Sequence, residues 1–218
     1  MRAGKIIAIL IVLASFATAF YFYPSMPDMV VSHWDAQGIA NGYMSKFWGL
    51  FLMPIVALAA LILMLVIPRI DPKRDNIKKF GSYFSGFIAL FMLFFYYIYT
   101  LTLMWNLGKK FDMIAFIVPA FAVLFFYIGI MLRHAKMNWS IGIRTPWTLS
   151  SEKVWDNTHQ LGGKLFMAAA IISLVGLFFR RHAIWFMLLP IIAAVIYSLA
   201  FSYFDYKKLP AEDKKKKQ

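Results

Sequence analysis

The chain has 218 residues, of which 61% are apolar, 18% are aromatic and only 15% are charged. This composition excludes an ordinary soluble domain and indicates an integral membrane protein with room for about six spans of roughly 20 residues. It has no cysteine, which excludes disulfides, thiolate metal sites and cysteine nucleophiles. The net charge of +13 is spread along the loops, where it fixes topology, so no direct nucleic-acid partner is expected.

Six apolar runs follow one another and predict six transmembrane helices. They cover residues 4–23, 47–68, 81–107, 113–132, 165–179 and 183–206. The first run has the pattern of a cleavable secretory signal, but the bulky residues Phe20 to Tyr23 continue it past the small ones, which favours a retained signal-anchor. The fifth run is short for a span, although Gly162 and Gly163 can extend it.

Basic residues set the expected orientation. If all six runs cross, 18 of the 23 Lys and Arg residues lie on one side of the membrane and 5 on the other. Cytoplasmic loops carry the excess of Lys and Arg, so the side with 18 is expected to be cytoplasmic. If the fifth run did not cross, the lysines of the C-terminal tail would lie outside, against this rule. The expected fold class is an all-α membrane protein, a bundle of six transmembrane helices with N and C termini cytoplasmic, multi-pass in the cell membrane and with the lipid bilayer as its surroundings.

The expected organisation is a single membrane domain with two parts. Residues 1–68 form an N-terminal helical hairpin with an ordered external loop at 24–46, here called the outer loop. Residues 69–218 form a four-helix membrane region with a cytoplasmic loop at 133–163, here called the inner loop. The lysine run 214–217 reads as a solvated tail, with attachment to anionic lipid or to an acidic partner as the alternative.

In the outer loop, Pro24 and Pro27 end the first helix, turn signals follow, and residues 29–34 are expected to form a strand or a segment along the surface. His33 and Asp35 offer two metal ligands, but zinc needs three or four, so neither a metal nor a cofactor is expected. Trp34 and Tyr43 beside them favour capping of the bundle or contact with an external apolar peptide.

The inner loop is a polar segment between two long apolar runs and carries three tryptophans. Gly142 permits a turn, Pro146 is expected to stop regular structure after Thr145, and Ser150 to cap a helix that starts at Ser151. Arg144 is a fork of donors suited to phosphate, carboxylate or helix carbonyls. Either these side chains hold the loop onto helix ends or they contact a ligand directly, and both can apply. The candidate ligand- or partner-binding residues of the two loops are Asn138, Gly142, Arg144, Thr145, Trp147, Thr148, Trp155, His159, His33, Trp34 and Asp35.

The apolar runs contain no Asp, Glu, Lys, Arg or His away from their ends. Pumps and ion-coupled carriers usually place such groups at mid-bilayer, so active transport is disfavoured. A catalytic site is also disfavoured, because His33 with Asp35 and His159 with Arg144 lie on opposite leaflets in this topology. Neither side assembles an acid, a base and a nucleophile.

The chain resembles the SdpI-type membrane immunity proteins, which protect bacteria against a secreted, membrane-active, sporulation-delaying toxin. The resemblance covers nearly the whole chain. In the inner loop it rests on Asn138, Gly142, Ile143, Arg144, Thr145, Pro146, Trp147, Thr148, Ser150, Trp155, His159 and Gly162. In the outer loop Pro27, His33, Trp34, Gly38, Ser45 and Lys46 resemble the N-terminal module of unknown function that accompanies the family.

This resemblance implies an immunity or sensor protein, not an enzyme, that confers resistance to an external toxin peptide. It also implies a cytoplasmic autorepressor as a partner, docked on the cytoplasmic face, because the family's best-known member draws such a protein to the membrane. Two other functions stay open from the residues alone. One is an enzyme of lipid or envelope chemistry, and the other is a passive carrier for a small amphipathic molecule.

Overall fold

The computed structural model describes residues 2–210, apart from the side chains of residues 2, 180 and 181, and six long helices dominate it. They are α1 (Arg2–Phe22), α2 (Lys46–Ile70), α4 (Gly81–Asn106), α5 (Met113–His134), α7 (Glu152–Val175) and α8 (Ala183–Lys207). Each is long and apolar enough to cross a membrane, so the six predicted spans are confirmed. The lysine run 214–217 lies outside the described residues.

The fifth span is longer than its apolar run, because it is continuous with the helix expected to start at Ser151. Helix α7 begins at Glu152, well before the apolar run that starts at Leu165. Its first turns carry polar residues, and Trp155, Thr158 and His159 among them are buried against the rest of the inner loop. Packing within the protein therefore extends the helix beyond the segment that hydropathy identifies.

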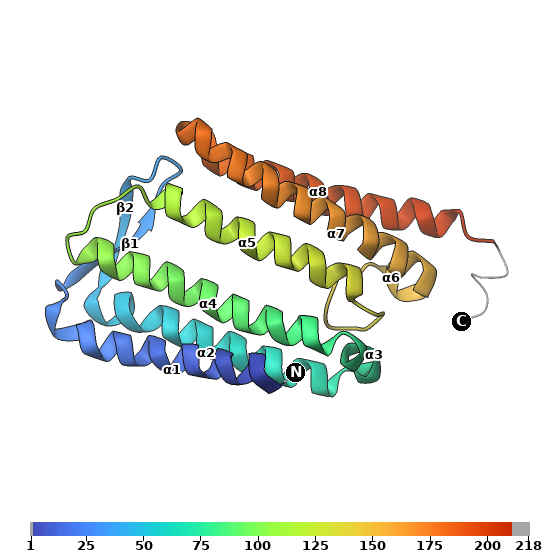
Figure 1. Ribbon diagram of the computed structural model, residues 1–218, viewed down its shortest axis with the longest axis horizontal. Helices are drawn as coiled ribbons and strands as arrows, with labels where there is room; N and C mark the ends of the chain where they lie inside the picture. Colours follow the sequence, from blue (N-terminus) through green and yellow to red (C-terminus); the bar gives the residue numbers. More distant parts are fainter. Residues whose placement is uncertain (1, 211–218) are drawn as a thin grey trace.

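The long helices form two groups of three (Figure 1). Helices α1, α2 and α4 pack together, α5, α7 and α8 pack together, and α4 joins the groups through its contact with α5. In the second group α5 and α7 approach closely at Gly129 and Gly163. A Cβ atom on either glycine would lie 2.6 Å from the other's carbonyl oxygen, so only glycine permits this packing.

Short elements close the two ends of the bundle. At one end lie β1 (Met29–Trp34) and β2 (Ala40–Ser45), an antiparallel pair here called the outer hairpin. The strand expected at 29–34 is thus confirmed. At the opposite end lie α3 (Arg74–Lys79) and α6 (Pro146–Ser150), together with the first turn of α1 and the last turn of α8 (Figure 1). The 3-10 turns η1 (Tyr23–Ser25) and η2 (Gly176–His182) complete the chain.

The outer and inner loops accordingly lie at opposite ends of the bundle, as expected from six crossings. That the inner end faces the cytoplasm stays a prediction from the distribution of basic residues. The division of the chain at residues 68 and 69 also stays a prediction.

Candidate functional site

A short helix, α6, stands at the centre of the inner loop, where the sequence suggested a break. Thr145 caps it: its hydroxyl accepts from the Thr148 amide at 3.1 Å, while the Thr148 hydroxyl accepts from the Thr145 amide at 2.9 Å. The expectation that Pro146 stops regular structure was wrong. Proline lacks an N–H and has a fixed φ, both of which suit the first turn of a helix.

The start of α7 also differs from the sequence expectation. Ser151, not Ser150, caps the helix, and its hydroxyl accepts from the Val154 amide at 3.4 Å. Ser150 closes α6 instead, donating to the Pro146 carbonyl at 2.6 Å. Because Ser150 and Ser151 are adjacent, the sequence alone did not show which of them caps α7. Ser150 is the last residue of α6, so Ser151 takes the cap position.

Helix α6 is fixed to α8 by one polar and one aromatic contact. The hydroxyls of Thr145 and Ser202 lie 3.1 Å apart in a buried position. The rings of Trp147 and Tyr203 meet edge to face with their centroids 5.0 Å apart. The inner loop is therefore attached to the last span as well as to α7.

Asn138 organises the turn that precedes α6. The residue is fully buried, and its amide nitrogen donates to the carbonyls of Lys136 at 2.8 Å and Ile141 at 2.9 Å. Its side-chain oxygen accepts from the backbone amides of Ser140 at 2.8 Å and Ile141 at 2.6 Å. All of these partners are backbone groups of the same turn, so Asn138 holds the loop in shape and has no group left for a ligand.

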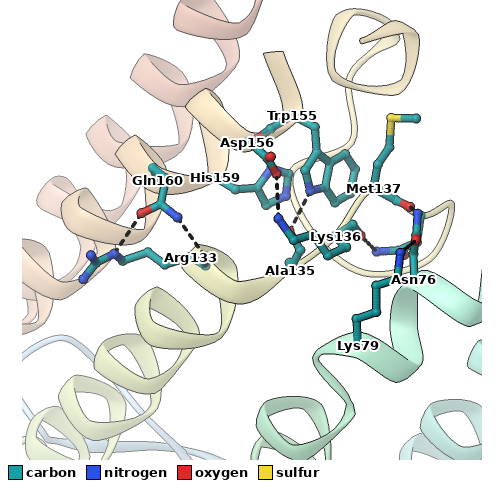
Figure 2. Close-up of polar contacts among 11 residues, drawn as sticks. Asn76, Lys79, Arg133, Ala135, Lys136, Met137, Trp155, Asp156, His159 and Gln160 are labelled. Atoms are coloured by element: carbon teal, nitrogen blue, oxygen red, sulfur yellow. Dashed lines mark hydrogen bonds and ion pairs between the residues drawn. The ribbon is translucent and has the colours of Figure 1, made fainter. Parts of the chain in front are cut away.

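Trp155 and His159 form a buried stacked pair beneath this turn (Figure 2). Their ring centroids are 3.9 Å apart, and the Trp155 indole N–H donates to the Ala135 carbonyl at 2.9 Å. His159 Nδ1 lies 2.8 Å from the Trp155 carbonyl, and its Nε2 accepts from the Ile143 amide at 2.9 Å. Because a carbonyl can only accept, Nδ1 carries the proton. The ring is neutral with both nitrogens occupied, which leaves no free atom for proton transfer.

Gly142 is required where the loop passes over this pair. Its φ of +125° is a conformation that other residues rarely adopt. A Cβ atom there would lie 2.4 Å from His159 Nε2 and 3.1 Å from the Trp155 ring. The glycine predicted from sequence as a turn residue is thus also the one residue type that lets the loop contact the stacked rings.

Two residues that sequence reasoning missed tie the inner loop to the first helix group. Asp71, buried after α2, accepts through one oxygen from the Trp139 amide at 3.0 Å and from the Ser140 hydroxyl. Asn76 of α3 donates to the Met137 carbonyl at 2.8 Å (Figure 2). Asp71 and these two partners are nearly 70 positions apart in the sequence. The sequence near Asp71 shows only an aspartate before Pro72, which does not indicate these contacts.

Polar pairs at the rim complete the attachment of the inner loop to α7 (Figure 2). Gln160 donates to the Arg133 carbonyl at 2.8 Å, and Arg133 Nε donates back to the Gln160 side chain at 3.2 Å. Lys136 and Asp156 form an ion pair at 3.5 Å. Both pairs are exposed, so their contribution to stability is small.

Arg144 differs from the other predicted residues of the inner loop because its side chain is exposed. One guanidinium nitrogen donates to the Trp139 carbonyl at 2.6 Å. The Trp139 ring beside it is 53% exposed. An arginine and a tryptophan at the free surface of a rigid loop form a surface suited to a partner, whereas Asn138, Thr148, Trp155 and His159 are enclosed.

At the other end, in the outer hairpin, His33 and Asp35 bond to different partners. His33 is exposed and its Nδ1 donates to the Asn41 side-chain oxygen at 2.6 Å. Asp35 accepts from the amides of Gln37 and Ile39, each at 2.9 Å, which shapes the turn. No group of three or more His, Asp or Glu side chains suited to a metal occurs in the described part of the chain.

Trp34 packs on the bundle: its ring meets that of Trp105 edge to face, with centroids 5.5 Å apart. Nearby, the side chain of Asn106 at the end of α4 accepts from the Val31 amide at 2.8 Å and donates to the Val31 carbonyl at 2.9 Å. These contacts fix β1 on α4. The free surface of the hairpin is instead formed by Ile39 and Tyr43, which are 63% and 60% exposed.

Comparison with known proteins finds sequence similarity in both parts of the chain. Residues 134–202 match the SdpI/YfhL protein family, and residues 10–58 match a domain of unknown function (DUF1648). The chain is 28% identical over 206 residues to the immunity protein SdpI of Bacillus subtilis (strain 168). The aligned region covers 94% of this chain and 97% of that protein. No solved structure matches the chain. The resemblance to SdpI-type proteins is confirmed, and the chain is a multi-pass cell-membrane protein.

Proposed function

We propose that this relative of the SdpI-type immunity proteins confers resistance to a secreted, membrane-active peptide toxin by binding it rather than by catalysis. The observation that carries the proposal is the extent of the similarity to an immunity protein, which covers 94% of the chain. The similarity extends over both the outer hairpin and the inner loop and is not confined to one helix.

The outer hairpin offers the surface for the toxin. Ile39 and Tyr43 are well exposed on it, and Phe47 and Trp48 at the start of α2 continue the exposed apolar surface. Aromatic side chains with an apolar body and a polar tip suit the membrane–water interface. A membrane-active peptide that arrives from outside meets this surface first and can bury its apolar face there.

The hairpin is a fixed platform, which favours binding. Asn106 holds the backbone of Val31, and Lys46 pairs with Asp28 at 3.3 Å. The Trp34 and Trp105 rings close the base. Because the surface is already ordered, less conformational entropy is lost when a peptide binds.

The exposed part of the inner loop is the proposed contact for a cytoplasmic repressor protein. Arg144 and Trp139 lie together there, and these two residue types contribute strongly to protein interfaces. The buried network around Asn138 and His159 holds them in place. In this proposal the inner loop carries two roles, a rigid base and a small exposed contact.

Binding is favoured over enzyme chemistry because polar side chains at both ends of the bundle are occupied by structural hydrogen bonds. His159 has both nitrogens occupied, Asp35 shapes a turn, and Asp71 accepts three bonds from the loops around it. In the described residues these groups do not assemble an acid, a base and a nucleophile around one space.

The test is a protection assay in a toxin-sensitive Bacillus subtilis strain that lacks its own immunity protein. Cells that express this chain should grow in the sporulation-delaying toxin, while cells with an empty vector should not. Mass spectrometry of the recovered toxin should show it intact. Absence of protection at verified expression contradicts the proposal, and cleaved or modified toxin replaces binding by an enzymatic function.

A further inference from the structure

An apolar cavity of about 510 Å³ lies between the two helix groups and reaches the inner loop. Helix α2 contributes Ala60 and Met64 to its wall, α4 contributes Phe87, and α5 contributes Met131. Gly142 and Ile143 of the inner loop also line it. The cavity therefore touches the loop segment that carries the family resemblance, and nothing in the proposed toxin contact uses it.

The mouth of this cavity faces the bilayer. Leu63 and Ile67 belong to its wall, yet both are also exposed on the outer surface of α2, Leu63 by 56%. In a membrane-spanning helix such a surface contacts lipid chains. An acyl chain can thus enter sideways from the surrounding leaflet.

A second cavity, of about 540 Å³, adjoins the first, and Met64, Pro68 and Phe84 line both. It lies at the inner end of the bundle, where α3 begins. Four basic residues from three helices line it: Lys5, Arg69, Arg74 and Lys78. The apolar cavity thus continues into a basic one.

The positive charge of the second cavity is largely uncompensated. Lys78 pairs with Asp75 at 2.6 Å, and Asp75 is not part of the wall. Among the residues that the structure describes, Lys5, Arg69 and Arg74 have no carboxylate within ion-pair distance. Basic pockets between transmembrane helices on the cytoplasmic side attract anionic headgroups.

We propose that the two cavities together bind one anionic phospholipid of the cytoplasmic leaflet. The phosphate lies among Lys5, Arg69 and Arg74, and one acyl chain occupies the apolar cavity as far as Gly142 and Ile143. A lipid fits better than an acidic protein segment because the apolar part opens to the bilayer. The bound lipid joins the two helix groups at the inner loop.

The experiment is native mass spectrometry of the purified full chain in detergent. Dioleoyl phosphatidylglycerol, dioleoyl phosphatidylethanolamine and inorganic phosphate are added in separate arms. We expect one phosphatidylglycerol to remain bound under conditions that remove phosphatidylethanolamine, with no retained phosphate. Equal retention of the two lipids overturns the proposal, and so does retention of inorganic phosphate that displaces the lipid.

Two variants separate the headgroup from the chain. Arg69→Gln/Arg74→Gln should weaken phosphatidylglycerol binding about tenfold, whereas Lys153→Gln/Lys208→Gln, a matched loss of charge outside the cavity, should not. Ala60→Phe should weaken it by narrowing the apolar cavity, whereas Ala59→Phe, on the exposed side of α2, should not. Unchanged binding in either cavity variant, with the protein folded, overturns the proposal. These readouts do not involve a toxin, so the proposed immunity function is tested separately.

Discussion

The inner loop buries the polar side chains at its centre, whereas the outer hairpin exposes its His33 and Tyr43. Asn138, Trp155 and His159 are enclosed, and their polar groups bond to backbone atoms. In the hairpin His33 and Tyr43 stand in solvent. A buried polar group that loses its partner costs about 1–3 kcal/mol, whereas an exposed one can turn to water. Substitutions should therefore reduce stability in the inner loop and reduce binding in the hairpin.

The largest expected effect belongs to Trp155→Ala. The change removes a fully buried ring and leaves the Ala135 carbonyl without its donor, for a loss of about 3–5 kcal/mol. Thermal unfolding in detergent and the yield of folded protein measure it. Trp139→Ala, in the same loop but exposed, is the matched control and should stay within about 0.5 kcal/mol. Equal losses of stability in the two variants would contradict the claim that buried residues of the inner loop stabilise the protein more than exposed ones.

Asp71→Ala should have the next largest effect. Three donors, the Lys73 amide, the Trp139 amide and the Ser140 hydroxyl, lose their acceptor, which should cost about 1–3 kcal/mol of stability. The unfolding temperature in detergent is the readout. Asp75→Ala in the same segment removes an exposed carboxylate whose ion pair is with the likewise exposed Lys78, so it should leave that temperature unchanged. A neutral Asp71→Ala would show that the Asp71 contacts between the inner loop and the first helix group do not stabilise the protein.

Arg144→Ala sharpens the comparison, because Arg144 is the exposed member of the inner loop. We expect unchanged protein abundance but several-fold weaker recruitment of the proposed cytoplasmic repressor to the membrane, measured by co-purification, since the exposed guanidinium of Arg144 is available to that partner. Lys153→Ala, on the exposed first turn of α7, should preserve this recruitment. If Arg144→Ala instead lowers the amount of folded protein, the arginine holds the loop and is not a contact.

Sequence patterns predict well where a structure depends on local chemistry. The six spans follow from apolar runs, and the strand at 29–34 follows from its flanking prolines and turns. Gly142 is identified as a turn residue for the same reason. Each of these features depends on neighbours in the chain, so periodicity and turn residues identify it.

The features that were missed depend on distant residues or on a choice between two local roles. Asp71 and Asn76 form hydrogen bonds with carbonyl, amide and hydroxyl groups more than 60 positions away, and a local sequence pattern cannot predict such bonds. For Trp34 the sequence left two roles open, capping of the bundle or contact with an external peptide, and its ring contact with the distant Trp105 supports the first. Pro146 suits both the end and the first turn of a helix, and only the capping hydroxyl of Thr145 selects between them.

The most direct test of the account is toxin resistance in cells that express hairpin variants at matched abundance. Ile39→Ser/Tyr43→Ser removes the exposed apolar surface without touching the contacts that anchor the hairpin. Resistance should fall by about tenfold or more, corresponding to roughly 1–3 kcal/mol of lost binding, while His33→Asn should be almost neutral. Full resistance in the double variant, with a severe defect in His33→Asn, would contradict toxin binding by the outer hairpin.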